Sequence, residues 1–171
     1  MTIYGRIKQG RGTVIGNAGE YLVVGELLRR DIVAAPAPRN TPGFDVLATT
    51  GEKSVNVRVK SKTAAANSWV WISGRGSERI IFKGLLREGD FTVLADLKDT
   101  TVSPDYWVYP TKTLDDELQT DFKHWVESPG RGGRQHSADS RMYRFGHLPH
   151  HQPLQEIHHN AWNLIVEFLT S

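Results

Sequence analysis

The chain contains no cysteine among its 171 residues. Disulfide bonds, thiolate zinc sites and cysteine nucleophiles are therefore excluded. No apolar run approaches the roughly 20 residues that a membrane-spanning helix requires. The first six residues lack the apolar core of a signal peptide. These absences predict a protein that works in the cytoplasm and makes no use of a membrane.

The chain also has no large excess of charge of either sign, because it contains 21 basic and 19 acidic residues and its formal net charge is +2. The total charge therefore does not identify a nucleic-acid-binding protein, but its distribution is uneven. Between residues 129 and 147 the only acid is Asp139, and four arginines gather there: Arg131, Arg134, Arg141 and Arg144. We predict that these arginines bind nucleic-acid phosphates. A solvated loop without a ligand is the alternative.

The chain has no internal repeats, and its length fits one domain over residues 1–171. Helical spacing covers residues 14–30, a region about Leu114 to Trp125, and a third region about Leu154 to Phe168. Strand patterns lie between the first two helices, at 32–35, 44–49, 54–60, 69–73, 91–97 and 106–109. This order predicts an α/β or α+β fold with one mixed central sheet flanked by helices.

The pattern at residues 54–60 is the clearest strand signal. Valines at 55, 57 and 59 face one side, whereas Asn56, Arg58 and Lys60 face the other. A turn at 50–53 joins this strand to the apolar strand that carries Asp45. We therefore predict that Asp45 and Lys60 lie on adjacent antiparallel strands, with their side chains on one face of the sheet.

An aspartate within an apolar strand requires a partner or a metal ion, because burying an unpaired charge is costly. A carboxylate and a second oxygen ligand hold Mg²⁺ at about 2.1 Å. The metal lowers the pKa of its water, and a lysine nearby can orient that water or stabilise the developing anion. Asp45 and Lys60 thus fit phosphodiester hydrolysis. The alternatives are an ion pair of Asp45 with Arg58 or Lys60, and a solvated Lys60.

Two segments of the chain, one around Asp45 and one around Lys60, resemble the core of a known family. Gly43-Phe44-Asp45-Val46-Leu47-Ala48, followed by Val57-Arg58-Val59-Lys60-Ser61, is similar to the core of the PD-(D/E)xK nuclease superfamily. The segment 16–23, which contains Glu20, resembles the superfamily's first core helix. The likeness covers about residues 13–127, and residues 128–171 add the basic loop and a C-terminal helix.

The resemblance implies a restriction-endonuclease-like fold and a DNA endonuclease, with RNA as an alternative substrate and a homodimer as a compatible assembly. Asp45 and Glu20 would bind Mg²⁺ or Mn²⁺, and Lys60 would serve catalysis. Glu20 also has a structural interpretation, because it follows Asn17 by three residues, which is the spacing of a capping box.

Arg58 departs from the superfamily pattern, because it stands where a Glu, Asp or Gln is usual. Arginine stays charged and cannot bind a metal ion. A second hypothesis follows, in which the protein is a catalytically inactive nucleic-acid-binding or assembly subunit and Arg58 contacts the nucleic acid. A pure protein-interaction module is a third. The histidines at 147–159 are interrupted by Pro149 and Pro153, so we predict no metal site there.

Overall fold

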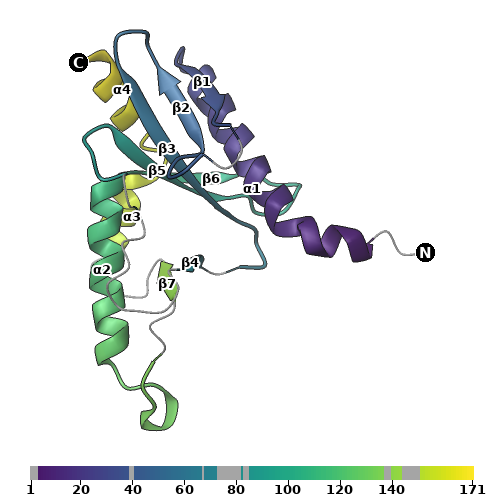
Figure 1. Ribbon diagram of the computed structural model, residues 1–171, viewed down its shortest axis with the longest axis vertical. Helices are drawn as coiled ribbons and strands as arrows, with labels where there is room; N and C mark the ends of the chain where they lie inside the picture. Colours follow the sequence, from purple (N-terminus) through teal and green to yellow (C-terminus); the bar gives the residue numbers. More distant parts are fainter. Residues whose placement is uncertain are drawn as a thin grey trace.

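The computed structural model describes residues 4–38, 41–66, 68–72, 82, 85–136, 140–143 and 151–171, and all statements below concern these residues. Figure 1 shows a twisted sheet with helices on both faces. The elements, in chain order, are α1 (Tyr4–Leu28), β1 (Val33–Pro36), β2 (Val46–Thr49), β3 (Ser54–Lys62), β4 (Trp69–Ile72), β5 (Asp90–Asp96), β6 (Asp105–Pro110), α2 (Thr111–Glu127), a 3-10 turn (Arg131–Gly133), β7 (Ser140–Tyr143), α3 (His151–His158) and α4 (Asn163–Thr170).

The central sheet has five strands in the order β1-β2-β3-β5-β6. The pairs β1–β2, β2–β3 and β5–β6 are antiparallel, whereas β3 and β5 are parallel. The sheet is therefore mixed, and the predicted fold class is confirmed. The prediction that β4 joins this sheet is wrong: it pairs with β7 in a separate two-stranded sheet. Both edges of β3 are already occupied by β2 and β5, so the strand that follows it has no place beside it.

The two faces of the sheet carry two hydrophobic cores. On one face α1 and α4 pack on the valines of β3, as Val23, Leu27 and Ile165 are fully buried. On the other face α2 and the β4–β7 sheet cover a core that includes Trp69, Trp71, Leu94, Trp107, Tyr109, Leu114 and Tyr143. The two tryptophans of β4 are buried in this core, so they are packing groups.

Helix α1 lies unusually close to β3 at Gly19. A Cβ atom at this position would lie 1.8 Å from the Ser61 Oγ and 3.0 Å from its Cβ. The missing side chain therefore permits the close approach, which sets the height of Glu20, the next residue, above the sheet. The helix begins at Tyr4, so Asn17 and Glu20 lie in its interior. The predicted start near residue 14, and the capping-box interpretation of Glu20, are wrong.

The last predicted helix is divided into α3 and α4. Asn160 between them has a left-handed φ of 51°. Its N–H donates to the Tyr106 carbonyl at 2.8 Å, and His159 forms a bridge with Trp107. The chain is thus held along the β6 edge before α4 enters the core. None of the described helices is long and apolar enough to cross a membrane.

Candidate functional site

Asp45 is fixed by the backbone of β3. Its N–H donates to the Val57 carbonyl at 2.9 Å, and its Oδ2 accepts the Val59 N–H at 2.8 Å. These bonds extend the antiparallel β2–β3 pairing by one residue beyond Val46. The carboxylate therefore has a defined position over the middle of β3, and its Oδ1 accepts no hydrogen bond from the described residues.

Arg58 lies directly beside this carboxylate. Its Nε is 3.4 Å from the Asp45 Oδ2, and its Nη1 donates to the Gly43 carbonyl at 3.2 Å. The ion pair that the sequence left as an alternative is thus present in the structure. The Arg58 side chain is 36% exposed, so the pair contributes at most about 1 kcal/mol to stability. Its effect on the site is to place a fixed cation against Asp45.

Lys60 follows Arg58 by two residues on the same face of β3, since both alternate with buried Val59. Its ammonium nitrogen lies 5.5 Å from the centre of the Trp71 ring. Burial lowers the pKa of Lys60, the nearby Arg58 lowers it further, and Asp45 opposes this shift. The strand continues to Lys62, so the interpretation of Lys60 as a solvated strand end is wrong.

Glu20 and Asp45 line the same cavity, which has a volume of about 230 Å³. Helix α1 forms one wall, and the chain between β1 and β2 forms the other. The residues that line it are Thr13, Asn17, Glu20, Ala37, Pro38, Thr41, Phe44 and Asp45. The structure therefore brings together two of the predicted carboxylates, from segments that are separated in sequence.

The donor set of this cavity is small for a metal site. Within the described part of the chain, no group of three His, Cys, Asp or Glu side chains could hold a metal ion. Magnesium, however, is commonly bound by one or two carboxylates, with water and substrate phosphates as the remaining ligands. Glu20 and Asp45 meet that lower requirement, while Arg58 competes for the Asp45 oxygens.

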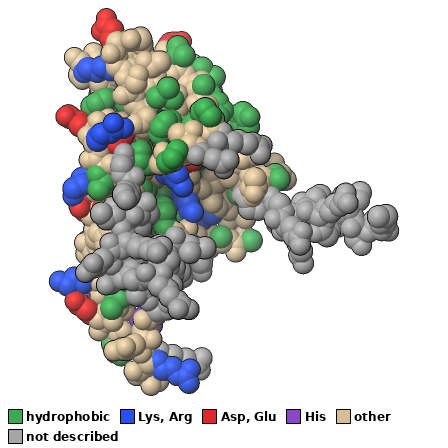
Figure 2. Space-filling view, viewed as in Figure 1, with side chains coloured by type: hydrophobic (Ala, Val, Ile, Leu, Met, Phe, Trp, Pro, Cys, Tyr) green, Lys and Arg blue, Asp and Glu red, His purple; other side chains and the backbone are tan. Residues whose placement is uncertain are grey.

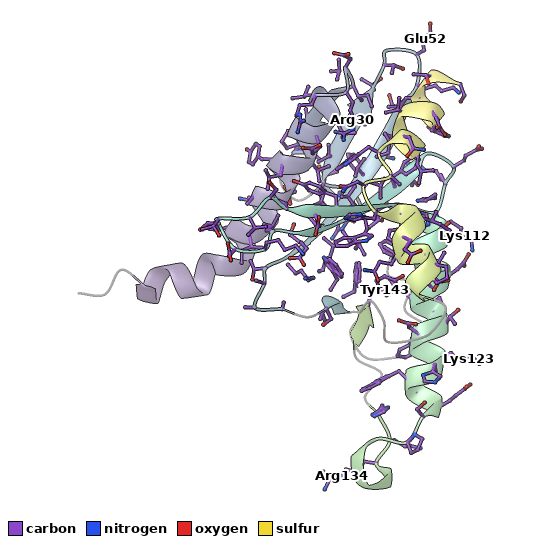
Figure 3. All side chains as sticks on the ribbon, turned by 180° about the vertical axis from the view of Figure 1, so that it is seen from behind. Arg30, Glu52, Lys112, Lys123, Arg134 and Tyr143 are labelled. Atoms are coloured by element: carbon purple, nitrogen blue, oxygen red, sulfur yellow. The ribbon has the colours of Figure 1, made fainter. Side chains whose placement is uncertain are left out.

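The predicted phosphate-binding arginines lie elsewhere. Figure 3 places Arg134 at the end of α2 that is distant from the central sheet. Arg134 is exposed there, after the 3-10 turn. The side chains of Arg131 and Arg141, and all of Arg144, lie outside the described residues. The structure therefore does not bring Arg134 to the cavity of Glu20 and Asp45.

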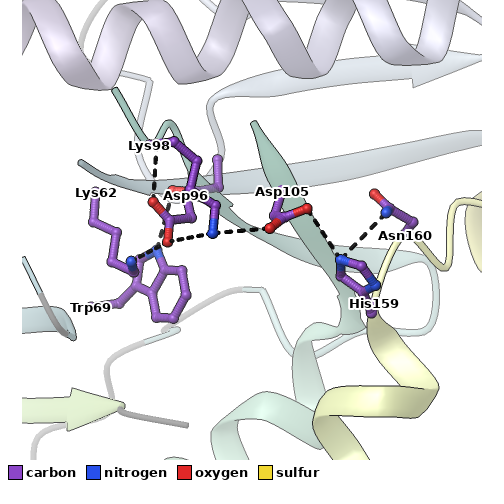
Figure 4. A network of polar contacts seen from close by, with 8 residues as sticks. Lys62, Trp69, Asp96, Lys98, Asp105, His159 and Asn160 are labelled. Atoms are coloured by element: carbon purple, nitrogen blue, oxygen red, sulfur yellow. Dashed lines mark hydrogen bonds and ion pairs between the residues drawn. The ribbon is translucent and has the colours of Figure 1, made fainter. Parts of the chain in front are cut away.

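A charged network that sequence analysis missed lies across the ends of β3, β5 and β6 (Figure 4). Lys62 pairs with Asp96, and Lys98 bridges Asp96 at 3.5 Å and Asp105 at 3.0 Å. His159 Nε2 lies 3.3 Å from the Asp105 Oδ1. Burial alone would raise the pKa of Asp96, but hydrogen bonds from Lys62 and Lys98 hold it below its usual value.

This network lines a larger cavity of about 580 Å³ with Trp69 and Trp107 among its walls. Its charges alternate and satisfy one another, so we interpret it as structural. The members of this network come from four segments of the chain. The one sequence feature that indicated the network was the presence of acids at the ends of the buried strand β5.

Comparison with known proteins supports the fold. No family model matches the chain, and no curated protein matches it in sequence. Among solved structures, a bacterial homing endonuclease, I-Ssp6803I, is similar, with a TM-score of 0.54 and 13% sequence identity. The alignment covers 91% of this chain and 93% of that chain. At this level of identity the likeness establishes a nuclease-like α+β fold.

Proposed function

We propose that the protein is a metal-dependent DNA endonuclease of the PD-(D/E)xK type, and that the cavity between α1 and the start of β2 is its reaction site. The observation that carries this proposal is that Glu20 and Asp45 line one cavity. Lys60 lies on the same face of β3 as Arg58, which is the ion-pair partner of Asp45. The similarity in fold to a homing endonuclease adds support.

In this proposal Glu20 and Asp45 hold Mg²⁺ or Mn²⁺. When bound, such a metal acidifies a water molecule and stabilises charge on a phosphoryl oxygen. Asp45 is oriented for this role by the Val59 N–H. Lys60, in its protonated form, stabilises the negative charge that develops on the phosphate. Arg58 contacts the same phosphate group, or it keeps Asp45 occupied until a substrate draws the guanidinium away.

A second candidate function is favoured by the ion pair of Arg58 and Asp45. If that pair persists when nucleic acid binds, the cation takes the place of the metal. The protein is then a catalytically inactive nucleic-acid-binding or assembly subunit. Both candidates are expected to act in the cytoplasm on DNA, with RNA as the alternative partner.

A nicking assay on supercoiled plasmid with Mn²⁺ distinguishes the two functions. We expect native protein to nick slowly and Asp45→Asn to be inactive, because the substitution removes an anionic ligand. Asp99→Asn is a matched control, since Asp99 is exposed on a loop beyond β5. Electrophoretic mobility shifts should show that both variants still bind DNA. DNA binding without nicking by native protein would instead support the inactive subunit.

A further inference from the structure

Three cations lie at alternate positions on one face of β3, namely Arg58, Lys60 and Lys62. This face carries the second hydrophobic core, because the pairing of β3 with β5 sets Lys60 beside Leu94 of that core. Figure 2 shows Lys and Arg side chains over the middle of the molecule, where Figure 1 places β3. Positions two apart on a strand are separated by roughly 6–7 Å, so these three charges repel one another unless each has a partner.

The partners of the three cations differ in kind. Arg58 and Lys62 each pair with an aspartate, so the two outer cations are neutralised. Lys60 lies between them and forms no hydrogen bond or ion pair with any of the described residues. Its ammonium nitrogen lies instead 5.5 Å from the centre of the Trp71 ring, which is within the range of a cation–π contact. The central cation is thus held by an aromatic face and not by an anion.

Trp71 is itself fixed by packing. It is 6% exposed, and its ring meets that of Phe82 edge to face, with the ring centres 6.0 Å apart. Its indole Nε1 is buried and has no hydrogen-bond partner in the described part of the chain. A phenylalanine would avoid that cost, whereas an indole attracts a cation more strongly than the other aromatic rings do. The type of ring therefore agrees with a contact to a cation.

The same strand presents a second tryptophan to β3. Trp69 precedes Trp71 by two residues in β4, and the Lys62 ammonium lies 4.8 Å from the Trp69 ring centre. Lys62 also pairs with Asp96, so its charge is used within the fold. Of these two lysines, Lys60 is the one whose charge no carboxylate among the described residues neutralises.

An aromatic face suits a lysine that binds a phosphate. Burial lowers the pKa of Lys60, and the charge of Arg58 lowers it further. The electron-rich face of Trp71 opposes both effects, because it stabilises the ammonium form. A carboxylate would do the same, but it would also neutralise the charge and repel a phosphate. The ring adds no full negative charge, so the ammonium keeps its attraction for an anion.

We infer that Trp71 is a positioning residue, which holds the Lys60 ammonium toward a phosphate of bound nucleic acid. The inference rests on the proposed function, of which it uses the contact between Lys60 and a phosphate. Trp71 itself touches no substrate and acts through Lys60. The small β4–β7 sheet, which lies outside the central sheet, is then part of the reaction site.

Proton NMR of the lysine side chains tests the contact without any assumption about function. An aromatic ring shifts protons above its face upfield, so the ε-methylene signal of Lys60 should lie upfield of that of exposed Lys123. Lys60→Met identifies the signal by its loss. Trp71→Leu should abolish the shift, Trp71→Phe should retain much of it, and the matched control Trp69→Leu should leave it unchanged. An unshifted Lys60 signal in native protein would overturn the inference, even if Trp71→Leu does not fold.

A double-mutant cycle on DNA binding tests the role of Trp71. Fluorescence anisotropy with a labelled duplex, without divalent metal so that the duplex stays intact, measures the dissociation constant. We expect Trp71→Leu to raise it at least about threefold, the size of a lost cation–π contact, and Trp71→Phe to raise it less. In a Lys60→Met background, Trp71→Leu should have no further effect. An equal rise in both backgrounds would show that Trp71 serves only the fold, and would overturn the inference.

The outcome of this cycle is separable from that of the plasmid-nicking assay. Coupling between Trp71 and Lys60 in DNA binding, without nicking by native protein, would support the inference for an inactive DNA-binding subunit and reject the nuclease. Nicking without this coupling would support the nuclease and reject the role of Trp71. A native protein that does not bind DNA would overturn both.

Discussion

Arg58 and Asp45 meet across the hairpin of β2 and β3, and their contact decides how readily a cation enters the cavity. The guanidinium also bonds to the Gly43 carbonyl, so it spans the approach to the carboxylate. Because the Arg58 side chain is 36% exposed, water screens this pair to a net stabilisation of at most about 1 kcal/mol, but the guanidinium also repels a divalent ion that approaches the carboxylate. A divalent ion must displace this partner, and we therefore expect weak metal binding by native protein.

Replacing Arg58 should reverse that effect. We expect Arg58→Glu to raise the affinity for Mn²⁺ at least about tenfold, because it removes the competing cation and adds a carboxylate ligand. Arg58→Gln should do so less. Isothermal titration calorimetry measures both, with Arg134→Glu as the control, since Arg134 is exposed at the end of α2 that is distant from the central sheet. Equal Mn²⁺ affinity in native protein and Arg58→Glu would show that Arg58 does not compete with the metal ion for Asp45.

Lys60 gives the protein a pH dependence of known sign. Burial lowers its pKa from 10.5 in the folded state, so the unfolded chain binds the proton more tightly. The free energy of unfolding should therefore rise with pH through the window between the lowered pKa and 10.5. Lys60→Met should lose this rise. Urea titrations across that window, with Lys123→Met on the exposed side of α2 as the control, measure the difference. If the difference in unfolding free energy between native protein and Lys60→Met were constant with pH, the assignment of this pH dependence to Lys60 would be contradicted.

At the scale of elements, the close approach of α1 to β3 at Gly19 positions Glu20. Gly19→Ala should destabilise the fold by about 1–3 kcal/mol, because the added methyl overlaps Ser61. Gly16→Ala lies on the same helix and meets no atom within 4 Å, so it should instead stabilise by up to about 1 kcal/mol through helix propensity. Chemical denaturation of both variants tests this pair. Equal stability of the two alanine variants would show that Gly19 does not set the helix position.

The elements also show where sequence patterns suffice. The alternation of β3 and the turn at 50–53 are local signals, and they correctly predicted the antiparallel pairing of β2 and β3. Asp45 itself lies directly before β2, where its N–H extends the pairing by one bond to Val57. The pairing of β4 with β7 is not local, because Trp69 pairs with Tyr143, which lies far away in the sequence. The break between α3 and α4 likewise depends on a tertiary bond, from the Asn160 N–H to Tyr106. Helical spacing alone continues through that position.

For the molecule as a whole, the fold class was predictable because the order of elements is consistent with few sheet topologies. The cavity was less predictable from the sequence. Spacing in the sequence supplied Asp45 and Lys60, whereas Glu20 came from resemblance to a family. The cavity that Glu20 and Asp45 share, and that Lys60 does not line, is visible only in three dimensions. The network of Lys62, Asp96 and His159 was not anticipated, since distant segments converge on it. Arg134 lies at the far end of α2, so a substrate that contacts both it and the cavity must span the molecule.

The central claim is that Glu20 and Asp45 form a divalent metal site, and paramagnetic broadening by Mn²⁺ in amide NMR spectra tests it most directly. We expect selective loss of the signals of Glu20, Asp45 and Val59 at low Mn²⁺ in Arg58→Glu, and at higher Mn²⁺ in native protein. Asp45→Asn should abolish this loss. Broadening centred on Asp96 and Asp105, or no selective broadening in any variant, would contradict the account.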